Sequence, residues 1–363
     1  MLTNLDNFWL LVLKVLTNFL HLCPYVFLFL NNVASILMRP SCLLLLSIIY
    51  LSFSACGPNQ PISTAKSNIP FKVEPTPTIA VTIDDLPGIS LDDFADVTDK
   101  LLTTLRKYEV PAIGFVNEGK LYHKRKLEET KLALLEDWLE AGMELGNHTY
   151  SHPDYNKLTF EEFSANLLKG EKHTKALQAK YGQKMAYFRH PFLHKGNTAE
   201  KKAQLEQFLI EQDYIEAPVT IDNAEWVFAK AYHVSLRAKD SLQMKKIGAS
   251  YVEYMEAMTA FYESNAQTLF GRPIAHTLLI HANALNGDYL DELLAMYQQR
   301  GYQFVSLKTA LEDEAYLSKD EFVGRGGITW LHRWAITQKV DKSFFAGEPA
   351  CPAFIQEIAG IRE

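Results

Sequence analysis

The sequence has no excess of positive charge. Its 36 lysines and arginines are outnumbered by 43 aspartates and glutamates, which gives a formal net charge of -7. A general nucleic-acid-binding protein needs a basic surface to displace counterions from phosphate, so this charge argues against nucleic acid as a partner. The sequence also has no internal repeat at a fixed period, which argues against solenoids and propellers. Apolar residues are plentiful: 48% are hydrophobic and 12% aromatic, enough for one large α/β domain or two smaller ones.

The first 56 residues have the features of a membrane-targeting segment. Residues 8–30 form an apolar run long enough to span a bilayer. The second run, residues 43–53, is too short to span comfortably but suits the apolar core of a secretory signal, with Arg39 before it. Residues 38–56 resemble a bacterial lipoprotein signal, in which the final cysteine, here Cys56, becomes the lipidated first residue of the mature protein.

We therefore expect translation to begin at Met38 and the mature chain to be lipid-anchored in the cell envelope, facing the periplasm or the exterior. A membrane-anchored N-terminal helix without cleavage is the alternative. Cleavage before Cys56 removes Cys23 and Cys42, so the mature chain retains one other cysteine, Cys351, and no intramolecular disulfide is expected. The fold must then be stabilised by its core, despite an oxidising compartment.

Residues 57–78 contain five prolines among small polar residues, which predicts an extended linker. After the linker, apolar strand-like runs alternate with amphipathic helical segments, the pattern of βαβ units. The predicted strands are residues 79–83, 112–116, 144–147, 186–189, 218–221, 277–281 and 303–306. The predicted helices are residues 92–108, 128–141, 160–181, 199–212, 241–270 and 289–300. We predict an α/β fold, a distorted (β/α) barrel of about seven strands over residues 79–312, with a C-terminal extension over residues 313–363 packing on it.

Polar side chains follow the ends of five predicted strands, and the carboxyl ends of barrel strands form a single rim. They are Asp84, Asp85, His148, His152, Arg189, Asp222, Glu225 and His281. On a helical turn, two histidines four residues apart can both reach one divalent metal ion. Such a pair is more often an ordinary capped turn, so the convergence of many groups on one rim is the stronger indication of an active site.

The residue types at this rim suit hydrolysis. Two histidines and one carboxylate leave positions on a metal ion open, and water bound to such an ion loses a proton near neutral pH. The second of the adjacent acids, left free, could accept that proton as a general base. Arg189 could hold this base ionised through a bidentate contact, and His281 could protonate the leaving group.

These motifs, in this order, resemble those of the NodB-homology polysaccharide deacetylases of carbohydrate esterase family 4. By that resemblance, residues 82–85 supply the base, Asp84, and a metal ligand, Asp85. Residues 148–152 supply two more ligands, His148 and His152, most often to zinc. Arg189 would orient the base, and His281, in the motif of residues 279–281, would be the general acid. The resemblance implies a metal-dependent hydrolase that removes acetyl groups from an N- or O-acetylated glycan.

The sequence departs from the family pattern at three motifs. Residues 86–88 follow the first motif where glycine is usual, and Phe192 and Leu193 replace an aromatic residue and glycine after the third. In the fourth, Glu225 precedes the tryptophan and Asp222 lies three residues before Glu225, so either acid could orient His281. The alternative functions are hydrolysis of another amide or ester, such as a small cyclic amide, and glycan binding by a lipoprotein without catalysis.

Residues 324–334, near the C-terminus, are rich in glycine, tryptophan and arginine. Aromatic faces beside charged groups are typical of sugar-binding grooves, but also of an extension that packs on a domain. We expect this segment to pack on the barrel and to contribute a residue or two to the rim of the groove.

Overall fold

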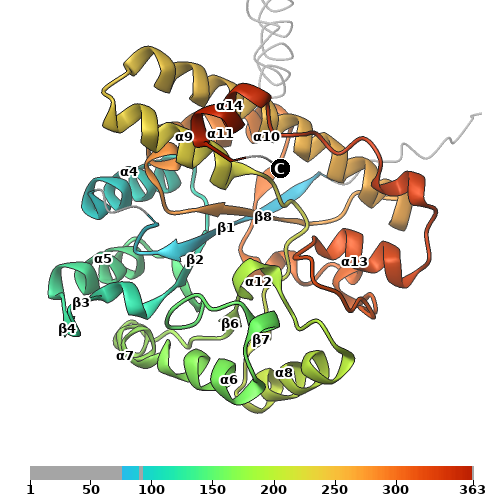
Figure 1. Ribbon diagram of the computed structural model, residues 1–363, viewed down its shortest axis with the longest axis horizontal. Coiled ribbons are helices and arrows are strands. Elements are labelled where there is room, and N and C mark those ends of the chain that lie inside the picture. The colour runs from blue at the N-terminus through green and yellow to red at the C-terminus, as the bar shows by residue number, and fades with distance from the viewer. Residues whose placement is uncertain (1–75, 90–92, 362–363) are drawn as a thin grey trace, which may run out of the picture. The chain divides into compact units, whose positions relative to one another are not determined.

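A curled parallel sheet lies at the centre of the domain, and β1 and its neighbour β8, an edge strand, cross the middle of the view (Figure 1). The computed structural model describes residues 76–89 and 93–361. Within them, seven strands form one sheet in the order β7-β6-β5-β2-β1-β8, and β9 also pairs with β1. Their bounds are β1 Thr78–Leu86, β2 Ile113–Val116, β5 Glu144–Asn147, β6 Tyr187–Phe188, β7 Ile215–Glu216, β8 His276–His281 and β9 Gln303–Phe304. The sheet forms a half-barrel with helices around it, which confirms the predicted fold class.

Strand β1 organises the sheet because three strands pair with it. Ile79 pairs with His276 of β8 on one edge and with Phe304 of β9 on the other. Further along this second edge, β2 takes over from β9, starting at Thr82. Apolar side chains of β1 are almost fully buried, as expected for a parallel strand covered on both faces. The strand therefore delivers its C-terminal residues to a fixed place at the sheet's edge.

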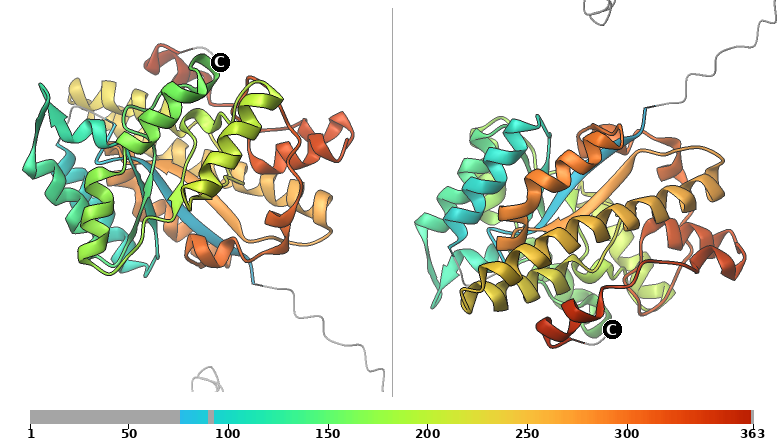
Figure 2. Two further views of the ribbon diagram at one scale, coloured as in Figure 1. Left: turned by 90° about the horizontal axis from the view of Figure 1, so that it is seen from below. Right: turned by 90° about the horizontal axis from the view of Figure 1, so that it is seen from above.

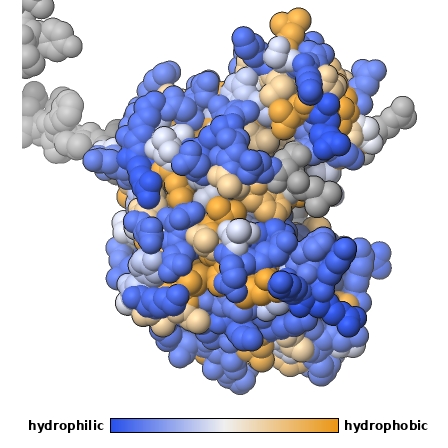
Figure 3. Space-filling model, turned by 90° about the vertical axis from the view of Figure 1, so that its left-hand side faces the viewer, coloured by the Kyte–Doolittle hydropathy of each residue, from blue (hydrophilic) through white to orange (hydrophobic). Residues whose placement is uncertain are grey.

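Helices surround the sheet (Figure 2). Their bounds are α4 Phe94–Lys107, α5 Glu129–Glu140, α6 Phe160–Lys169, α7 Lys172–Lys180, α8 Ala199–Glu211, α9 Glu225–Arg237, α10 Ser241–Phe270, α11 Ala284–Gln299, α12 Leu307–Ala310, α13 Trp330–Thr337 and α14 Ala353–Ala359. Helix α4 buries Leu101, Leu102 and Leu105, the spacing of one helical face. Hydrophilic residues cover most of the face in Figure 3, while hydrophobic residues gather across its middle.

The strand predicted at residues 218–221 is wrong. The strand in this region is β7, and Ile221 makes one isolated bridge, to Leu278 of β8. The backbone N–H of Ala217 still donates to Phe188 at one side of the sheet, whereas the carbonyl of Ile221 accepts from Leu279 at the other. Residues 217–221 thus connect the two edges of the sheet. They satisfy backbone groups at both edges without forming a regular strand.

Two helical predictions also differ from the structure. The helix predicted over residues 160–181 is two helices, α6 and α7, because α6 ends at Gly170. A Cβ atom at Gly170 would lie 2.5 Å from the backbone of Thr149, so the chain passes there at a distance that only glycine permits. Helix α9 was not predicted at all.

The N-terminal predictions lie almost wholly outside the described residues. This holds for the membrane-targeting segment of residues 1–56, the lipoprotein-like signal of residues 38–56 and most of the linker of residues 57–78. In the part of the chain that the structure describes, we find no helix that is long and apolar enough to cross a membrane. At the other end of the chain, α13 packs against α10 and α14 packs against α9.

Candidate active site

Asp84 and Asp85 both line one cavity, although adjacent side chains of a regular strand point to opposite faces. The strand is irregular at this point. The register of β1 against β2 shifts between Ile83 and Leu86, and Asp85 has a φ of 75°, which is unusual for a residue with a side chain. This irregularity turns the second carboxyl group to the same side as the first.

His148 and His152 follow β5, as predicted, but not on a helical turn. They lie in an irregular loop in which Thr149 and His152 have positive φ angles. Side chains hold this loop: Asn147 Oδ1 accepts from the Thr149 N–H at 2.7 Å, and Thr149 Oγ1 accepts from the His152 N–H at 3.1 Å. The two imidazole centroids are 4.7 Å apart. Local hydrogen bonds, rather than helical spacing, therefore bring the rings together.

Asp85, His148 and His152 form a candidate metal site. Each offers one ligand atom, and these atoms lie within 4.8 Å of one another. Asp85 Oδ1 is 3.8 Å from Nε2 of either histidine. Nδ1 of His148 is 2.8 Å from the carbonyl oxygen of Arg189, which can only accept, so Nδ1 carries the proton and Nε2 keeps its lone pair.

The charges at this site fit a divalent ion. Burial lowers the pKa of His148 well below its usual value and also lowers that of His152, so both rings are neutral. Burial alone would raise the pKa of Asp85, but the positive charge of Lys120 is the largest opposing effect, and the pKa lies well below its ordinary range. Asp85 Oδ1 is buried and accepts no hydrogen bond from the described residues. A neutral histidine pair with an ionised, unbonded carboxylate oxygen is a suitable set of ligands for such an ion.

Asp84 lies beside this site in a different environment. Its Oδ2 is 3.6 Å from Nε2 of His148 and 3.8 Å from Nη1 of Arg189. Arg189 is fully buried and donates through Nη2 to Thr82 Oγ1 at 2.8 Å, so it approaches Asp84 from one nitrogen and not through the bidentate contact that we expected. Burial raises the pKa of Asp84 to about 6, against the opposing effects of Arg189 and His281.

His281, at the end of β8, is paired with Glu225. Its Nδ1 lies 2.6 Å from Glu225 Oε2. Asn286 donates to the other carboxylate oxygen at 2.8 Å, and Asn283 also donates to it. Burial disfavours protonated His281, but Glu225 outweighs this and raises its pKa to about 9. Nδ1 therefore faces the carboxylate, which leaves Nε2 as the nitrogen available for chemistry.

Asp222 lines the same cavity without this contact. Its Oδ1 accepts from the backbone N–H of Asn223 at 2.9 Å, and burial raises its pKa to about 6. Of the two acids that could orient His281, the structure thus places Glu225 against Nδ1. Glu225 is the first residue of α9, where Asn223 Oδ1 accepts its backbone N–H at 3.0 Å.

Six of the eight predicted site residues line a cavity of about 590 Å³, and only Arg189 and Glu225 do not. The six are Asp84, Asp85, His148, His152, Asp222 and His281. Its other lining residues are Ile89, His190, Phe192, Leu193, His194, Asn223, Trp226, Leu279 and Gly327. Phe192 is 53% exposed and Trp226 is 47% exposed, so both present aromatic surface to solvent. An open cavity with acids, histidines and aromatic walls can hold a polar ring and act on a group attached to it.

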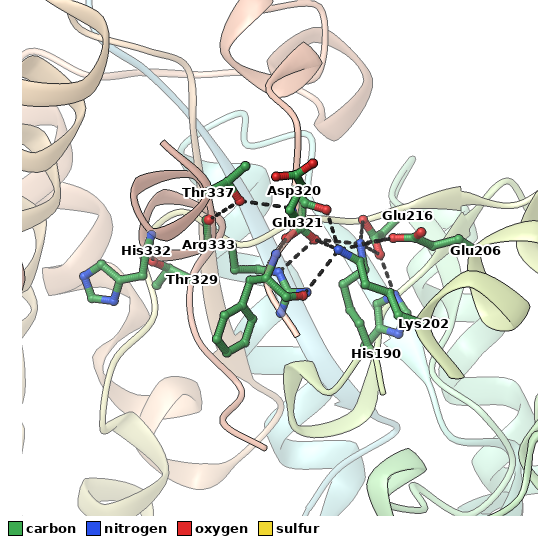
Figure 4. Close-up of polar contacts among 12 residues, drawn as sticks. His190, Lys202, Glu206, Glu216, Asp320, Glu321, Thr329, His332, Arg333 and Thr337 are labelled. Atoms are coloured by element: carbon green, nitrogen blue, oxygen red, sulfur yellow. Dashed lines mark hydrogen bonds and ion pairs between the residues drawn. The ribbon is translucent and has the colours of Figure 1, made fainter. Parts of the chain in front are cut away.

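A buried ion network holds the loop after β6 against the C-terminal part of the chain (Figure 4). His190 Nε2 is 2.7 Å from Glu216 Oε1, and Lys195 donates to Glu216 at 2.9 Å and to Asp320 at 3.1 Å. Arg333 also donates to Asp320, at 3.0 Å. Since buried charges are tolerated only when they are paired, this network fixes the position of the loop.

The loop held in this way carries Phe192 and Leu193, both with positive φ angles. The Phe192 ring contacts His152 edge to face, with centroids 4.5 Å apart. A Cβ atom at Gly327 would lie 1.7 Å from the Phe192 carbonyl oxygen, so only glycine can occupy that position. Gly327, in the segment rich in glycine and tryptophan, contributes to the cavity wall, whereas Trp330 and Trp334 are buried.

Sequence reasoning missed several residues that shape this site. Lys120 lies 3.3 Å from Asp85 Oδ1, and Asn283 and Asn286 bind Glu225. Lys120 and Asn283 come shortly after β2 and β8, so the rule that functional residues follow strand ends would have included them. No sequence signal marks Gly170, whose importance depends on which backbone passes beside it, whereas Gly327 belongs to the glycine-rich segment of residues 324–334 that we expected at the rim.

The fold and the grouped side chains define an α/β half-barrel with a candidate metal site and an acid–base pair at its rim. Residues 72–208 match the family described as polysaccharide deacetylase. None of the curated proteins searched matches the chain.

Several solved structures are similar to this chain at low identity. Peptidoglycan deacetylase PdaC from Bacillus subtilis is 21% identical, over 65% of this chain and 91% of that chain, with a TM-score of 0.41. The Xyl-CE4 domain of a multidomain xylanase from the hindgut metagenome of Trinervitermes trinervoides is 18% identical, over 66% and 91%, with a TM-score of 0.40. A mutant of BA3943, described as a CE4 family pseudoenzyme with restored enzymatic activity, is 18% identical, over 65% and 68%, with a TM-score of 0.43; the wild-type protein is from Bacillus anthracis.

Proposed function

We propose that this protein is a metal-dependent hydrolase that removes acetyl groups from an N- or O-acetylated polysaccharide of the cell envelope or the environment. One observation carries the proposal. Three ligand atoms of Asp85, His148 and His152 lie within reach of one ion, in the same cavity as the buried Asp84 and as His281, which Glu225 holds in orientation. The match to the polysaccharide deacetylase family supports the reaction class.

In this proposal Asp85, His148 and His152 hold a divalent ion, most suitably Zn²⁺ for two imidazoles and one carboxylate. When bound, the ion would supply Lewis-acid polarisation of the acetyl carbonyl group and of the attacking water. Asp84 accepts a proton from that water as general base. Its pKa of about 6 suits the task, because the carboxylate is ionised at neutral pH and still basic enough to take a proton.

His281 donates a proton to the departing amine or alcohol. With a pKa raised to about 9, it is protonated at neutral pH. Glu225 contacts Nδ1, so the proton on Nε2 is the one directed into the cavity. Glu225 is therefore a positioning residue in this proposal. The cavity wall supports a glycan substrate, because the exposed aromatic side chains of Phe192 and Trp226 can pack against sugar rings.

Two substitutions separate metal binding from catalysis. Asp84→Asn should retain bound Zn²⁺ and lose turnover by about 10²- to 10⁴-fold, because it removes the base and leaves the three ligands in place. His148→Ala should lose both metal and turnover. We would measure bound metal by elemental analysis and acetate release from chitooligosaccharides, acetylated xylan and peptidoglycan. Full activity in either variant would contradict the assignment.

The same substrate panel distinguishes the alternatives. Bound metal with acetate release supports the proposed deacetylase. Bound metal without acetate release favours hydrolysis of another amide or ester, such as a small cyclic amide. Neither metal nor release favours a glycan-binding protein without catalysis.

We propose in addition that the N-terminal segment anchors the protein in the cell envelope through a lipidated Cys56. Support comes from the sequence alone, because an apolar run and two small residues precede this cysteine. Mass spectrometry of the mature protein tests the proposal. A lipid-modified N-terminus at Cys56 is the expected result, and recovery of peptides from residues 1–37 would contradict it.

A further inference from the structure

The turn that follows β2 connects the two loops of the candidate metal site. It comprises Asn117 and the short helix Glu118–Leu121. Asn117 Nδ2 donates to the carbonyl oxygen of His148 at 2.5 Å, and the Gly119 N–H donates to that of Tyr150 at 2.7 Å. The next residue, Lys120, points to the other loop and reaches Asp85. The turn therefore binds both segments that supply the ligands.

Lys120 contacts Asp85 twice. Its Nζ donates to the backbone carbonyl oxygen of Asp85 at 3.0 Å and lies 3.3 Å from the carboxylate oxygen Oδ1. Oδ1 is the oxygen that lies 3.8 Å from Nε2 of both His148 and His152. The Lys120 side chain is 29% exposed, so its charge is only partly screened by water. The atom that would face the metal is therefore already next to a cation.

We propose that Lys120 is a resident counter-ion of the metal site, which stabilises the metal-free protein and weakens the binding of a divalent ion. This inference rests on the metal site of the proposed function. An ion that binds Asp85 Oδ1 must share this oxygen with the ammonium group of Lys120 or displace it. In the first case two positive charges are held close together, and in the second the ion pair and the hydrogen bond are lost.

Lys120 has an opposing effect, because its hydrogen bond to the Asp85 carbonyl helps to hold a residue with a positive φ. Losing that bond would loosen a ligand and weaken metal binding. The electrostatic effect is larger. Repulsion between an ammonium group and a dication is twice that between two single charges at the same distance, and at a few ångströms it exceeds the net contribution of one hydrogen bond. Removal of the charge should therefore tighten metal binding.

The proposal predicts two changes of opposite sign in one variant. Lys120→Met keeps most of the length of the side chain and removes the charge. Without Zn²⁺ its melting temperature should be lower than that of the wild type, because the carboxylates of Asp85 and Asp84 lose their counter-ion. Its Kd for Zn²⁺ should be at least about tenfold lower. The free energy that corresponds to a tenfold change in Kd is only a small part of the repulsion that the substitution removes. A purely structural role would instead lower stability and affinity together.

The experiment uses the full chain, stripped of metal, with Zn²⁺ affinity measured by competition with a chromophoric chelator and stability measured by thermal unfolding. Lys120→Arg keeps the charge and should stay close to the wild-type Kd. Lys126→Met removes an exposed positive charge six residues further along the chain and is the matched control for net charge. Lys120→Gln is a second neutral variant, in case Lys120→Met does not fold.

Each result decides a different point. A lower Kd in the neutral variants, with unchanged Kd in Lys120→Arg and Lys126→Met, supports the proposal. Equal or weaker Zn²⁺ binding by folded neutral variants overturns it and leaves the metal site standing. Absence of Zn²⁺ binding by the wild type and by every variant overturns the metal site and this inference with it.

Discussion

Two adjacent carboxyl groups, those of Asp84 and Asp85, have opposite protonation tendencies. Burial dominates at Asp84 and raises its pKa to about 6. At Asp85 the ammonium group of Lys120 is the largest effect that opposes burial, and the pKa lies well below its ordinary range. Asp85, the more acidic of the two, is thus the carboxyl group that lies with the two histidines. Different surroundings at neighbouring positions are what a base and a ligand in one site require.

The sequence identified most of these residues but not their geometry. Asp84, Asp85, His148, His152 and His281 were found because each lies near the end of a predicted strand. The structure agrees that they share one cavity. Spacing predicted a helical turn for the histidines, whereas Asn147 and Thr149 hold an irregular loop. Such local side-chain bonds depend on atomic positions that residue types do not reveal.

The choice between Asp222 and Glu225 shows a second limit. Both acids follow β7, and both suit the role of orienting His281. The choice depends on where α9 begins, and this helix was not predicted. Because Glu225 is the first residue of α9, its side chain points back to Asn283 and Asn286 at the start of α11. The choice between Asp222 and Glu225 therefore depends on how the N-terminal ends of α9 and α11 pack together.

Glu225→Gln should shift the pH dependence of turnover. In the proposed mechanism His281 acts as an acid and must be protonated, so activity should be lost as pH rises through its pKa, which Glu225 raises to about 9. A neutral glutamine no longer favours the imidazolium ion, and the alkaline limb of kcat/KM should move down by about one pH unit or more. We would measure kcat/KM for acetate release between pH 5 and about 10. An alkaline limb at the same pH in both proteins would contradict the role of Glu225.

At the scale of elements, a close approach between backbones ends α6 and positions the histidine loop. The amphipathic pattern of residues 160–181 predicted one helix; in the structure α6 buries Phe163 and Leu167, and α7 buries Leu177. The carbonyl of Asn166 in α6 accepts the N–H of Tyr150 at 3.1 Å, and Asn166 Oδ1 accepts the N–H groups of Tyr150 and Ser151. The end of α6 thus supports the loop between the two candidate ligands.

Gly170→Ala should destabilise the protein and disturb the candidate metal site together. The added Cβ atom would lie 2.5 Å from the backbone of Thr149, so the loop of His148 and His152 must shift. Overpacking of this kind costs about 1 to 3 kcal/mol in the free energy of unfolding. Zn²⁺ affinity should fall with it. Denaturant unfolding and chelator competition measure the two effects.

Gly287→Ala is the matched control for this substitution. Gly287 lies inside α11, and a Cβ atom there would meet its nearest neighbour at 3.6 Å, an ordinary contact. Alanine is favoured over glycine in a helix interior by up to about 1 kcal/mol, so this variant should be as stable as the wild type or more stable. Equal stability and Zn²⁺ affinity for the Gly170 and Gly287 variants would show that the close approach has no role.

At the scale of the whole domain, alternating strands and helices made the fold class predictable, because the period of apolar residues changes between two and about four along the chain. The connection of the two sheet edges by residues 217–221 was not predictable. Its backbone bonds go to Phe188 and Leu279, which are far apart in the sequence. The same holds for the network of His190, Glu216 and Asp320. Charged residues in a sequence read as surface until their partners are known.

Stability of the whole domain should depend on pH through His276, the first residue of β8. It is 2% exposed, its Nδ1 lies 3.1 Å from Thr220 Oγ1, and burial lowers its pKa from 6.5 to about 4. Between these two values the unfolded chain binds a proton that the folded protein does not. The free energy of unfolding should therefore fall as pH decreases from about 6.5 to about 4, by about 3 kcal/mol for a shift of this size.

His276→Gln tests this dependence by comparison of slopes rather than of absolute stabilities. The substitution can change stability at neutral pH, but it removes the titrating group, so the loss between pH 7 and about 4.5 should be smaller than in the wild type by about 2 to 3 kcal/mol. Buried histidines elsewhere, such as His332, titrate in both proteins and cancel in the comparison. His123→Gln, at an exposed histidine, should leave the wild-type slope unchanged. Parallel stability curves for the wild type and His276→Gln, measured by denaturant unfolding, would mean that His276 can accept a proton inside the folded domain at little cost.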